Sequence, residues 1–305
     1  MNVSYQTRAN LILLLGSVIW GFAFVAQRTG MQFVGPFTFN GVRFAIGGLV
    51  LIPLILYLDG QRKRSNLPVT PIRNRSLLLG GLLAGIFLFG GASLQQAGLV
   101  YTSAGKAGFI TSLYVILVPI MGLAFGQRTA AGTWIGALLA ITGLYLLSIQ
   151  GDLSVQIGDI LVLLGAFVWA GHVLLMGRLS PGMDPVKLSA VQFLVCAALS
   201  LFAAVLVETI SLSGIQQAMI PILYAGVLSV GVGYTFQVIG QRYAQPAHAA
   251  IIMSLESVFA VLGGWLLLDE QIGLRGLIGC AFMLTGILIS QLYGQHEVVV
   301  DGAAA

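Results

Sequence analysis

Four side chains that can carry a charge lie inside long apolar stretches of this chain: Arg43, Lys106, His172 and Glu256. A charged side chain at the centre of a bilayer costs at least about 2.5 kcal/mol, so such residues are candidates for function. Glu256 lies near the middle of its stretch. Its carboxyl group could face a cavity, where it would couple protons or bind a cation. Alternatively, it could be a neutral or paired group that hydrogen-bonds a neighbouring helix.

The basic candidates are open to two interpretations each. The long side chain of Arg43 could extend and place its guanidinium at the outer surface of the membrane. Alternatively, Arg43 could face a cavity and pair with Glu256 or a substrate carboxylate. Lys106 lies near the end of its stretch, where its side chain can reach the membrane surface at little cost in free energy. Alternatively, it could contact the substrate. His172 is either a structural hydrogen-bonding group or part of a proton relay. His248 lies at the opposite membrane face from Lys106, and the two could serve alternating openings.

Aromatic and neutral polar residues accompany these charges. Trp20 and Trp169 lie too deep to be interfacial anchors; they either pack between helices or wall a cavity that stacks on aromatic or cationic solutes. Tyr114 occupies in its stretch the place that Glu256 occupies in its own, and its hydroxyl needs a partner there. Neutral polar groups near the ends of the stretches are Asn40, Gln95 and Gln237. The set predicts a polar but nearly neutral cavity, which favours zwitterionic or amphipathic solutes.

Ten apolar stretches position these residues, each close to the ~20 residues that a helix needs to cross a hydrocarbon core of ~30 Å. Of the 305 residues, 58% are hydrophobic and 8% charged, and the mean hydropathy is +0.97. A soluble domain carries roughly 25% charged residues, so the composition predicts an all-α polytopic membrane protein. We predict helices at 10–29, 36–58, 76–97, 103–125, 131–149, 158–177, 186–207, 218–240, 246–268 and 273–293, a solvated connector at 59–75, and a disordered cytoplasmic tail at 294–305.

The basic residues set the expected orientation. A net charge of +4 and a pI near 9.2 would suggest nucleic acid as the partner of a soluble protein, but here most basic residues lie in short loops. Their excess on one side is typical of the cytoplasmic face. We therefore expect both termini in the cytoplasm. The predicted cytoplasmic set is Arg8, Arg62, Lys63, Arg64, Arg73, Arg75, Arg128, Arg178, Lys187 and Arg242, against Arg28 and Arg275 outside.

The stretches divide into two halves of five, 8–149 and 158–293. A unit with an odd number of crossings re-enters the membrane from the opposite side when it is repeated, which is the construction of many secondary transporters. Small residues one turn apart let the helices approach closely, and such faces could also serve a homodimer. The halves match in residues as well: Gly16-Ser-Val-Ile-Trp20 with Gly165-Ala-Phe-Val-Trp169, Phe44 with Phe193, Gln95 with Gln237, and Thr142-Gly143 with Thr285-Gly286.

On these residues the chain resembles the EamA type of the drug/metabolite transporter superfamily, over nearly all of 8–293. The resemblance implies an inner-membrane carrier of ten helices, in which helices one to four and six to nine surround a central cavity. Relatives often have a proline after the glutamate of helix nine, where this chain has Ser257, so the resemblance leaves open whether helix nine is kinked as in relatives. The motifs that carry the resemblance are Leu-Gly-Ser-Val-Ile-Trp20-Gly-Phe-Ala-Phe, Tyr101-Thr-Ser-Ala-Gly-Lys106-Ala-Gly-Phe with Pro119, Gly158-Asp-Ile-Leu, Trp169-Ala, Leu255-Glu256-Ser-Val-Phe-Ala and Leu268-Asp-Glu270.

Together these observations predict a gradient-driven carrier, with proton coupling at Glu256, that exports amino acids or related metabolites by alternating access. The alternatives are a membrane scaffold or receptor without flux, a channel, and an intramembrane enzyme. Sequence motifs of metalloproteases, serine hydrolases and ATP-driven pumps are absent, so we do not predict an enzyme. Cys196 and Cys280 lie in apolar runs without ligand-like neighbours, and we predict no metal or cofactor.

Overall fold

The structure, a computed structural model, describes residues 5–64, 74–102, 104–127, 129–148, 156–268 and 273–293. All regular elements in these residues are helices, as a chain in lipid requires in order to satisfy its backbone polar groups. The predicted tail at 294–305 lies outside the described residues. The elements are α1 Tyr5–Gly30, α2 Pro36–Arg64, α3 Asn74–Gly98, α4 Ala104–Ser112, α5 Tyr114–Ala124, α6 Ala131–Ser148, α7 Ile157–Leu179, η1 Ser180–Gly182, α8 Pro185–Val207, α9 Leu212–Gln217, α10 Met219–Leu223, η2 Tyr224–Tyr234, α11 Thr235–Gly240, α12 Pro246–Met253, α13 Glu256–Leu268 and α14 Leu274–Tyr293.

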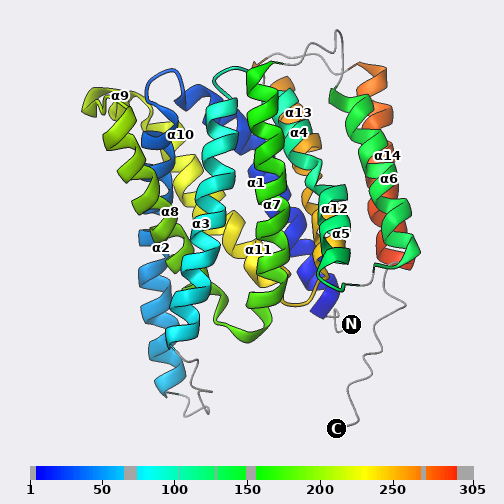
Figure 1. The fold of residues 1–305 in the computed structure, drawn as a ribbon, viewed down its shortest axis with the longest axis horizontal. Helices are drawn as coiled ribbons and strands as arrows, with labels where there is room; N and C mark the ends of the chain where they lie inside the picture. The colour runs from blue at the N-terminus through cyan, green and yellow to red at the C-terminus, as the bar shows by residue number, and fades with distance from the viewer. Residues whose placement is uncertain are drawn as a thin grey trace.

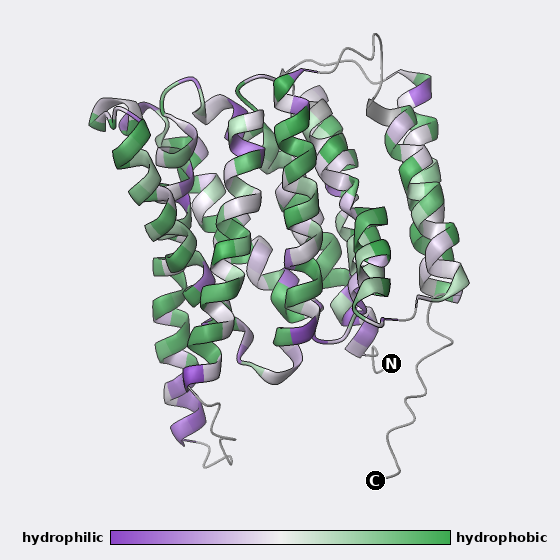
Figure 2. Cartoon of the chain, in the orientation of Figure 1, coloured by the Kyte–Doolittle hydropathy of each residue, from purple (hydrophilic) through white to green (hydrophobic). Residues whose placement is uncertain are grey.

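Eight segments of the described chain are long and apolar enough to cross a membrane. Two further apolar helices, Ala131–Leu146 in α6 and Leu274–Ser290 in α14, are shorter. Figure 2 shows hydrophobic residues along most of the bundle and a hydrophilic segment at the free end of α2. Large apolar side chains on the outer faces, such as Phe202 and Val205, are exposed as they would be to lipid.

Two helix pairs lie toward opposite edges of the bundle (Figure 1). α6 and α14 pack on each other through glycines: a Cβ added at Gly136 would lie 2.6 Å from the carbonyl oxygen of Gly286. At the other edge, Gly41 and Gly48 of α2 admit the leucines of α8 in the same way. Small residues let membrane helices approach closely where no hydrophobic force drives them together.

The predicted connector at 59–75 begins too early, because α2 continues to Arg64. The reason is a cluster of charges between the end of α2 and the start of α8. Arg62 forms an ion pair with Asp184, and Asp59 lies 2.8 Å from the Nζ of Lys187. These contacts hold the last turns of α2 in helical form although they are hydrophilic.

Two spans that the sequence predicts as single helices are interrupted in the middle. The stretch 103–125 divides into α4 and α5 around Leu113, and 246–268 divides into α12 and α13 around Ser254 and Leu255. At each interruption a backbone N–H bonds three residues back instead of four, from Leu113 to Ile110 and from Leu255 to Ile252 (3.2 Å each). The hydroxyl of Ser254 also donates to Ile251 (2.8 Å), and such a bond competes with the helical backbone. The chain therefore breaks this helix without a proline.

Candidate functional site

The interrupted helices border a small cavity of about 40 Å³ in the middle of the bundle. Five aromatic rings and one carboxyl group line it: Trp20 and Phe24 from α1, Tyr114 from α5, Trp169 from α7, Tyr234 from η2 and Glu256 from α13. Neutral polar side chains complete the lining, among them Gln27, Gln95, Thr111 and Gln237. Of the seven residues that the sequence suggests for a site, the structure brings Trp20, Tyr114, Trp169 and Glu256 together here.

Serine hydroxyls join the two interruptions to each other. The Oγ atoms of Ser112, at the end of α4, and Ser257, in the first turn of α13, are in hydrogen-bond contact. Ser257 Oγ also lies 3.2 Å from the carbonyl oxygen of Gly108, which it can reach as a donor. The crossing of these broken helices therefore fixes the positions of Tyr114 and Glu256, which begin the half-helices that follow.

Three oxygen atoms in the cavity wall, Thr111 Oγ1, Tyr114 Oη and Glu256 Oε1, are buried without a hydrogen bond of good geometry, although the hydroxyl of Tyr114 and the carboxyl group of Glu256 lie close enough to interact. Glu256 is 5% exposed. A buried polar group without a partner costs about 1–3 kcal/mol, and proteins normally avoid this. Three such atoms around one cavity indicate that it is built to receive polar groups from water or from a ligand.

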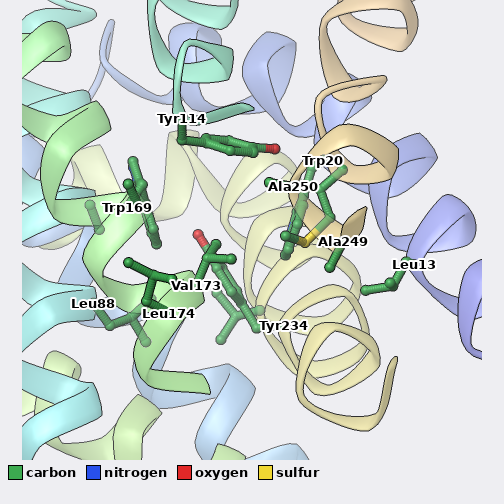
Figure 3. Close-up of a cluster of buried hydrophobic side chains, with 14 of the residues drawn as sticks. Leu13, Trp20, Leu88, Tyr114, Trp169, Val173, Leu174, Tyr234, Ala249 and Ala250 are labelled. Carbon is green, nitrogen blue, oxygen red and sulfur yellow. The ribbon is translucent and has the colours of Figure 1, made fainter. Parts of the chain in front are cut away.

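Both tryptophans are held in place by their indole N–H groups. Trp20 Nε1 donates to the carbonyl oxygen of Ser229 (3.2 Å), and Trp169 Nε1 donates to Gln95 Oε1 (2.9 Å). Figure 3 shows the two indoles on opposite sides of a space that Tyr114 and Tyr234 also border. The sequence leaves open whether these tryptophans pack or wall a cavity; in the structure they do both.

Tyr234 is the site residue that the sequence analysis missed. Its ring centroid lies 4.8 Å from that of Trp20 and 5.8 Å from that of Trp169, with which it stacks at 18°. Phe44 and Phe193 approach it from α2 and α8 at 6.0 and 6.1 Å. One signal could have found it, since Tyr234 lies three residues before Gln237 and therefore on the same face of its span.

Tyr234 ends an unusual segment of its span. Residues Tyr224–Tyr234 form a π-helix, η2, between the α-helical turns of α10 and α11. π-Helical turns are rare and frequently mark functional sites, because they change which side chains face a neighbouring helix. Gly233 gives the indole of Trp20 room to approach, since a Cβ there would lie 2.7 Å from Nε1.

Of the positions that we considered for Arg43, the structure shows neither contact with the outer surface nor a pair with Glu256. Arg43 is 2% exposed, so its guanidinium does not reach the surface, and it forms no ion pair with Glu256. Its Cζ lies 4.9 Å from the ring centroid of Phe44 and 5.5 Å from that of Phe39. Phe44 in turn contacts Tyr234, so Arg43 lies one ring behind the cavity wall.

The histidines are directed away from the cavity. His172 is fully buried, and its Nε2 shares a hydrogen bond with Gln192 Oε1 of α8 (2.9 Å). His248 contacts Ser290 Oγ of α14 through Nδ1 (3.0 Å). His248 is therefore buried against a neighbouring helix and does not line an open mouth. The side chain of Lys106 lies outside the described residues.

A second pocket, of about 420 Å³, lies beyond the far end of α3. It is lined by Arg28, Gln32, Tyr101 and Thr102, while Thr102 donates to Asp159 (2.7 Å) at the start of α7. None of the residues that line it lines the central cavity.

Comparisons with known proteins agree with this architecture. The model of the EamA-like transporter family matches residues 7–149 and 156–292. A protein of Archaeoglobus fulgidus named an uncharacterized transporter is 30% identical over 93% of this chain and 86% of its own length. The uncharacterized transporter YoaV of Bacillus subtilis is 26% identical, covering 90% of this chain and 93% of its own. The uncharacterized inner membrane transporter YedA of Escherichia coli is 25% identical over 81% and 78%.

A solved crystal structure has the same fold. It superposes with a TM-score of 0.78 at 20% sequence identity and covers 95% of this chain and 98% of its own. The family match spans both halves of the chain, and the relatives span most of its length. The chain belongs to the EamA-like transporter family.

Proposed function

We propose that this protein is a secondary transporter that moves small metabolites, such as amino acids or related amphipathic solutes, through the cavity between the interrupted helices. The observation that best supports this function is the set of three buried oxygen atoms around that cavity, from Thr111, Tyr114 and Glu256, that have no well-formed hydrogen bond. Discontinuous helices that meet in mid-membrane are typical of transporter binding sites. We place the protein in the bacterial inner membrane, working in the direction of efflux.

We further propose that the chain is built of ten spans in two inverted halves, 8–149 and 158–293. Contacts between α6 and α14 support this arrangement. Gly136 packs on Gly286, and Gly143 packs on Gly279. When the halves are aligned on Thr142 and Thr285, Gly136 corresponds to Gly279 and Gly143 to Gly286. A two-fold axis between α6 and α14 would exchange these two contacts, because it would carry Gly136 onto Gly279 and Gly286 onto Gly143.

The ends of α2 and α8 support the same symmetry. Asp59 pairs with Lys187 at 2.8 Å, and at the other end of this helix pair the hydroxyl of Thr38 donates to Glu208 at 2.6 Å. Asp59 and Glu208 are 149 positions apart, as are Thr38 and Lys187 and the two tryptophans Trp20 and Trp169. In Figure 1, α1 begins and α14 ends at the same end of the bundle, which fits the proposed cytoplasmic location of both termini.

In this proposal the two halves rock around the cavity, and Glu256 couples transport to protons. The carboxyl group of Glu256, one oxygen of which has no well-formed hydrogen bond, can exchange a proton with the solute-filled cavity as it opens to either side. The aromatic rings of Trp20, Trp169 and Tyr114 hold the apolar part of the solute. His172 and Lys106 stay in the proposal only as groups that bias the opening of the halves.

Flux measured in proteoliposomes tests this function. Purified protein is reconstituted, and uptake of a metabolite panel is followed with and without an imposed proton gradient. We expect gradient-dependent movement of at least one solute, whereas a scaffold moves none and a channel moves solute only down its own gradient.

The variant Glu256→Gln tests the coupling. It should lose the response to the proton gradient between about pH 5 and 8 while downhill exchange continues. Glu208→Gln removes the same charge at the end of α8 and should keep the response. Unchanged pH dependence in Glu256→Gln contradicts the role of this carboxyl group.

A further inference from the structure

Arg43 is the charge in this structure that its surroundings explain least. It lies in the outer part of α2, is 2% exposed and forms no ion pair within the described residues. Its Nε has no hydrogen-bond partner. A buried charge without a counter-charge is strongly unfavourable, so such a residue usually has a partner in the working protein. Most other described carboxyl groups are engaged at helix ends: Asp59 with Lys187, Asp184 with Arg62, Glu208 with Thr38, and Asp159 with Thr102.

The surroundings of Arg43 favour a cation but leave its hydrogen bonds open. The rings of Phe39 and Phe44, at 5.5 and 4.9 Å, attract the guanidinium electrostatically. The two rings do not accept hydrogen bonds from any of the five N–H groups, which lie in the plane of the guanidinium. One turn earlier on the same face of α2, Asn40 is fully buried with neither amide atom bonded. The two residues therefore present a group of unsatisfied donors to the interior.

Only aromatic rings separate this group from the central cavity. Phe44 contacts both Arg43 and Tyr234, and Tyr234 lines the cavity. The backbones of α2 and η2 are close here, since a Cβ on Gly226 would lie 3.0 Å from the carbonyl oxygen of Arg43. Tyr234 is the last residue of the π-helix, and a change of that segment toward α-helix would turn its side chain away. A shift of this one ring would widen the path from the cavity toward the guanidinium.

We propose that Arg43 binds the carboxylate of the transported solute, and that Tyr234 moves aside to admit it. This inference rests on the proposed transport function and adds the class of solute. One guanidinium supplies one positive charge in a fork that matches a carboxylate, whereas a phosphate with more negative charge would require further cations. Glu256, across Tyr234, then faces the rest of the solute.

The other half of the chain supplies a tolerated replacement. The residue 149 positions after Arg43 is Gln192, which lies in α8 next to Phe193 as Arg43 lies next to Phe44. Gln192 is also fully buried, and its Nε2 is unpartnered. A glutamine at position 43 thus reproduces chemistry that this fold already holds, so Arg43→Gln is expected to fold.

The experiment compares acids with their amides on the full-length protein. The probes are L-leucine and L-leucinamide, L-phenylalanine and L-phenylalaninamide, and 3-phenylpropionate and its amide. Binding is read in detergent as a shift of the thermal unfolding midpoint over a concentration series, and uptake is read in proteoliposomes. The variants are Arg43→Gln, Arg43→Lys and Tyr234→Phe, with Arg178→Gln as the control because Arg178 is exposed at the end of α7.

We expect the wild type to bind at least one acid about 10-fold or more tightly than its amide, the effect of one charge-assisted pair. Arg43→Gln should remove this preference and leave affinity for the amide unchanged, while Arg43→Lys should keep part of it. Tyr234→Phe and Arg178→Gln should retain it. A structural role of Arg43 would alter the unfolding midpoint without changing the ratio of acid to amide.

Two results overturn the inference: a wild type that responds equally to acids and amides, including no response to either, or a preference that survives in Arg43→Gln. Failure of the proposed transport function would give a different combination of results. Acid-selective binding that depends on Arg43 without uptake of any solute would refute the carrier and support the binding site. Uptake without acid selectivity would support the carrier and refute the role of Arg43.

Discussion

The α6–α14 pair and the crossing of the interrupted helices bring helices together with different residues. α6 and α14 meet through glycine backbones, and two of their hydroxyl groups are satisfied within their own helices. Thr142 donates to Leu138 and Thr285 donates to Ala281, both at 2.8 Å. A third hydroxyl group, that of Ser290, is bonded to His248 of α12. Among the described residues, this contact therefore serves the stability of the bundle.

The crossing of α4–α5 with α12–α13 shows the opposite pattern. Its serines bond across the interface, but Thr111, Tyr114 and Glu256 keep buried atoms without well-formed hydrogen bonds. Functional sites commonly give up stability in this way, because groups that wait for a ligand are unsatisfied without it. The comparison teaches where to look for each property: substitutions at the glycine pair should act on folding, and substitutions at the crossing should act on transport.

The largest effect is expected from Gly143→Val in α6. A Cβ there would lie 2.4 Å from the carbonyl oxygen of Gly279, and backbone cannot move aside as a flexible side chain can. We expect a loss of about 2–3 kcal/mol or more in unfolding free energy. Thermal unfolding in detergent measures it. Gly60→Val is the matched control, since nothing lies within 4 Å of a Cβ at that position. Equal midpoints in the two variants would contradict the role of the glycine contact.

A medium effect is expected at the N-terminal end of α8, where the charged side chains of Asp184 and Lys187 have partners. Asp184 accepts from the backbone N–H groups of Val186 and Lys187 and pairs with Arg62. Burial alone would raise the pKa of Asp184, but these donors outweigh it and hold the pKa below its usual value. A carboxyl group with a lowered folded pKa stabilises the fold above its unfolded pKa, and this contribution is lost as the pH falls through the folded value.

Asp184→Asn should therefore lower stability at neutral pH by about 1–2 kcal/mol, the range for a lost helix cap. Unfolding midpoints measured from neutral pH downward should begin to converge for wild type and variant as the pH falls below about 4, near the usual pKa of aspartate, and should meet below the lowered folded pKa of Asp184. Asp59→Asn, which breaks a more exposed pair, should cost less than about 1 kcal/mol. A gap between wild type and Asp184→Asn that is constant with pH would show that the carboxylate charge is not what matters.

The same contrast explains what the sequence can predict. Glu256, Trp20, Trp169 and Tyr114 can be placed in a cavity because polar or large aromatic residues deep in apolar stretches need a reason to be there. The eight long spans of the described chain follow from hydropathy alone. These inferences depend on composition and depth, which are local properties of the chain.

What the sequence does not reveal depends on backbone register and on distant partners. Tyr234 faces the cavity at the end of a π-helix, and no periodicity in the sequence marks that segment. The break before Glu256 comes from serine hydroxyls, whereas proline is the usual signal. His172 can be recognised as a buried polar group, but its partner Gln192 lies on another helix. Arg43 can be recognised as buried, but not as lacking an ion pair.

The smallest effect sharpens the comparison most, because its sign differs between two tyrosines. Tyr224 donates its hydroxyl to the carbonyl oxygen of Ile19 (3.0 Å), whereas the hydroxyl of Tyr114 is buried without a well-formed hydrogen bond. Removing a hydroxyl that is bonded loses about 1 kcal/mol, and removing one that is buried and unbonded relieves a cost of similar size. Tyr224→Phe should therefore lower the unfolding midpoint, and Tyr114→Phe should leave it unchanged or raise it.

Transport should respond in the reverse order. If the hydroxyl of Tyr114 waits for a solute, Tyr114→Phe weakens uptake in proteoliposomes while its fold is as stable as the wild type or more so. Tyr224→Phe should keep uptake per folded molecule, because its hydroxyl serves only a contact between helices. A Tyr114→Phe variant that is destabilised and transports normally would mean that this hydroxyl has a partner within the fold. The crossing would then be an ordinary packing contact like that of α6 and α14, and the cavity would lose the polar group that most clearly distinguishes it.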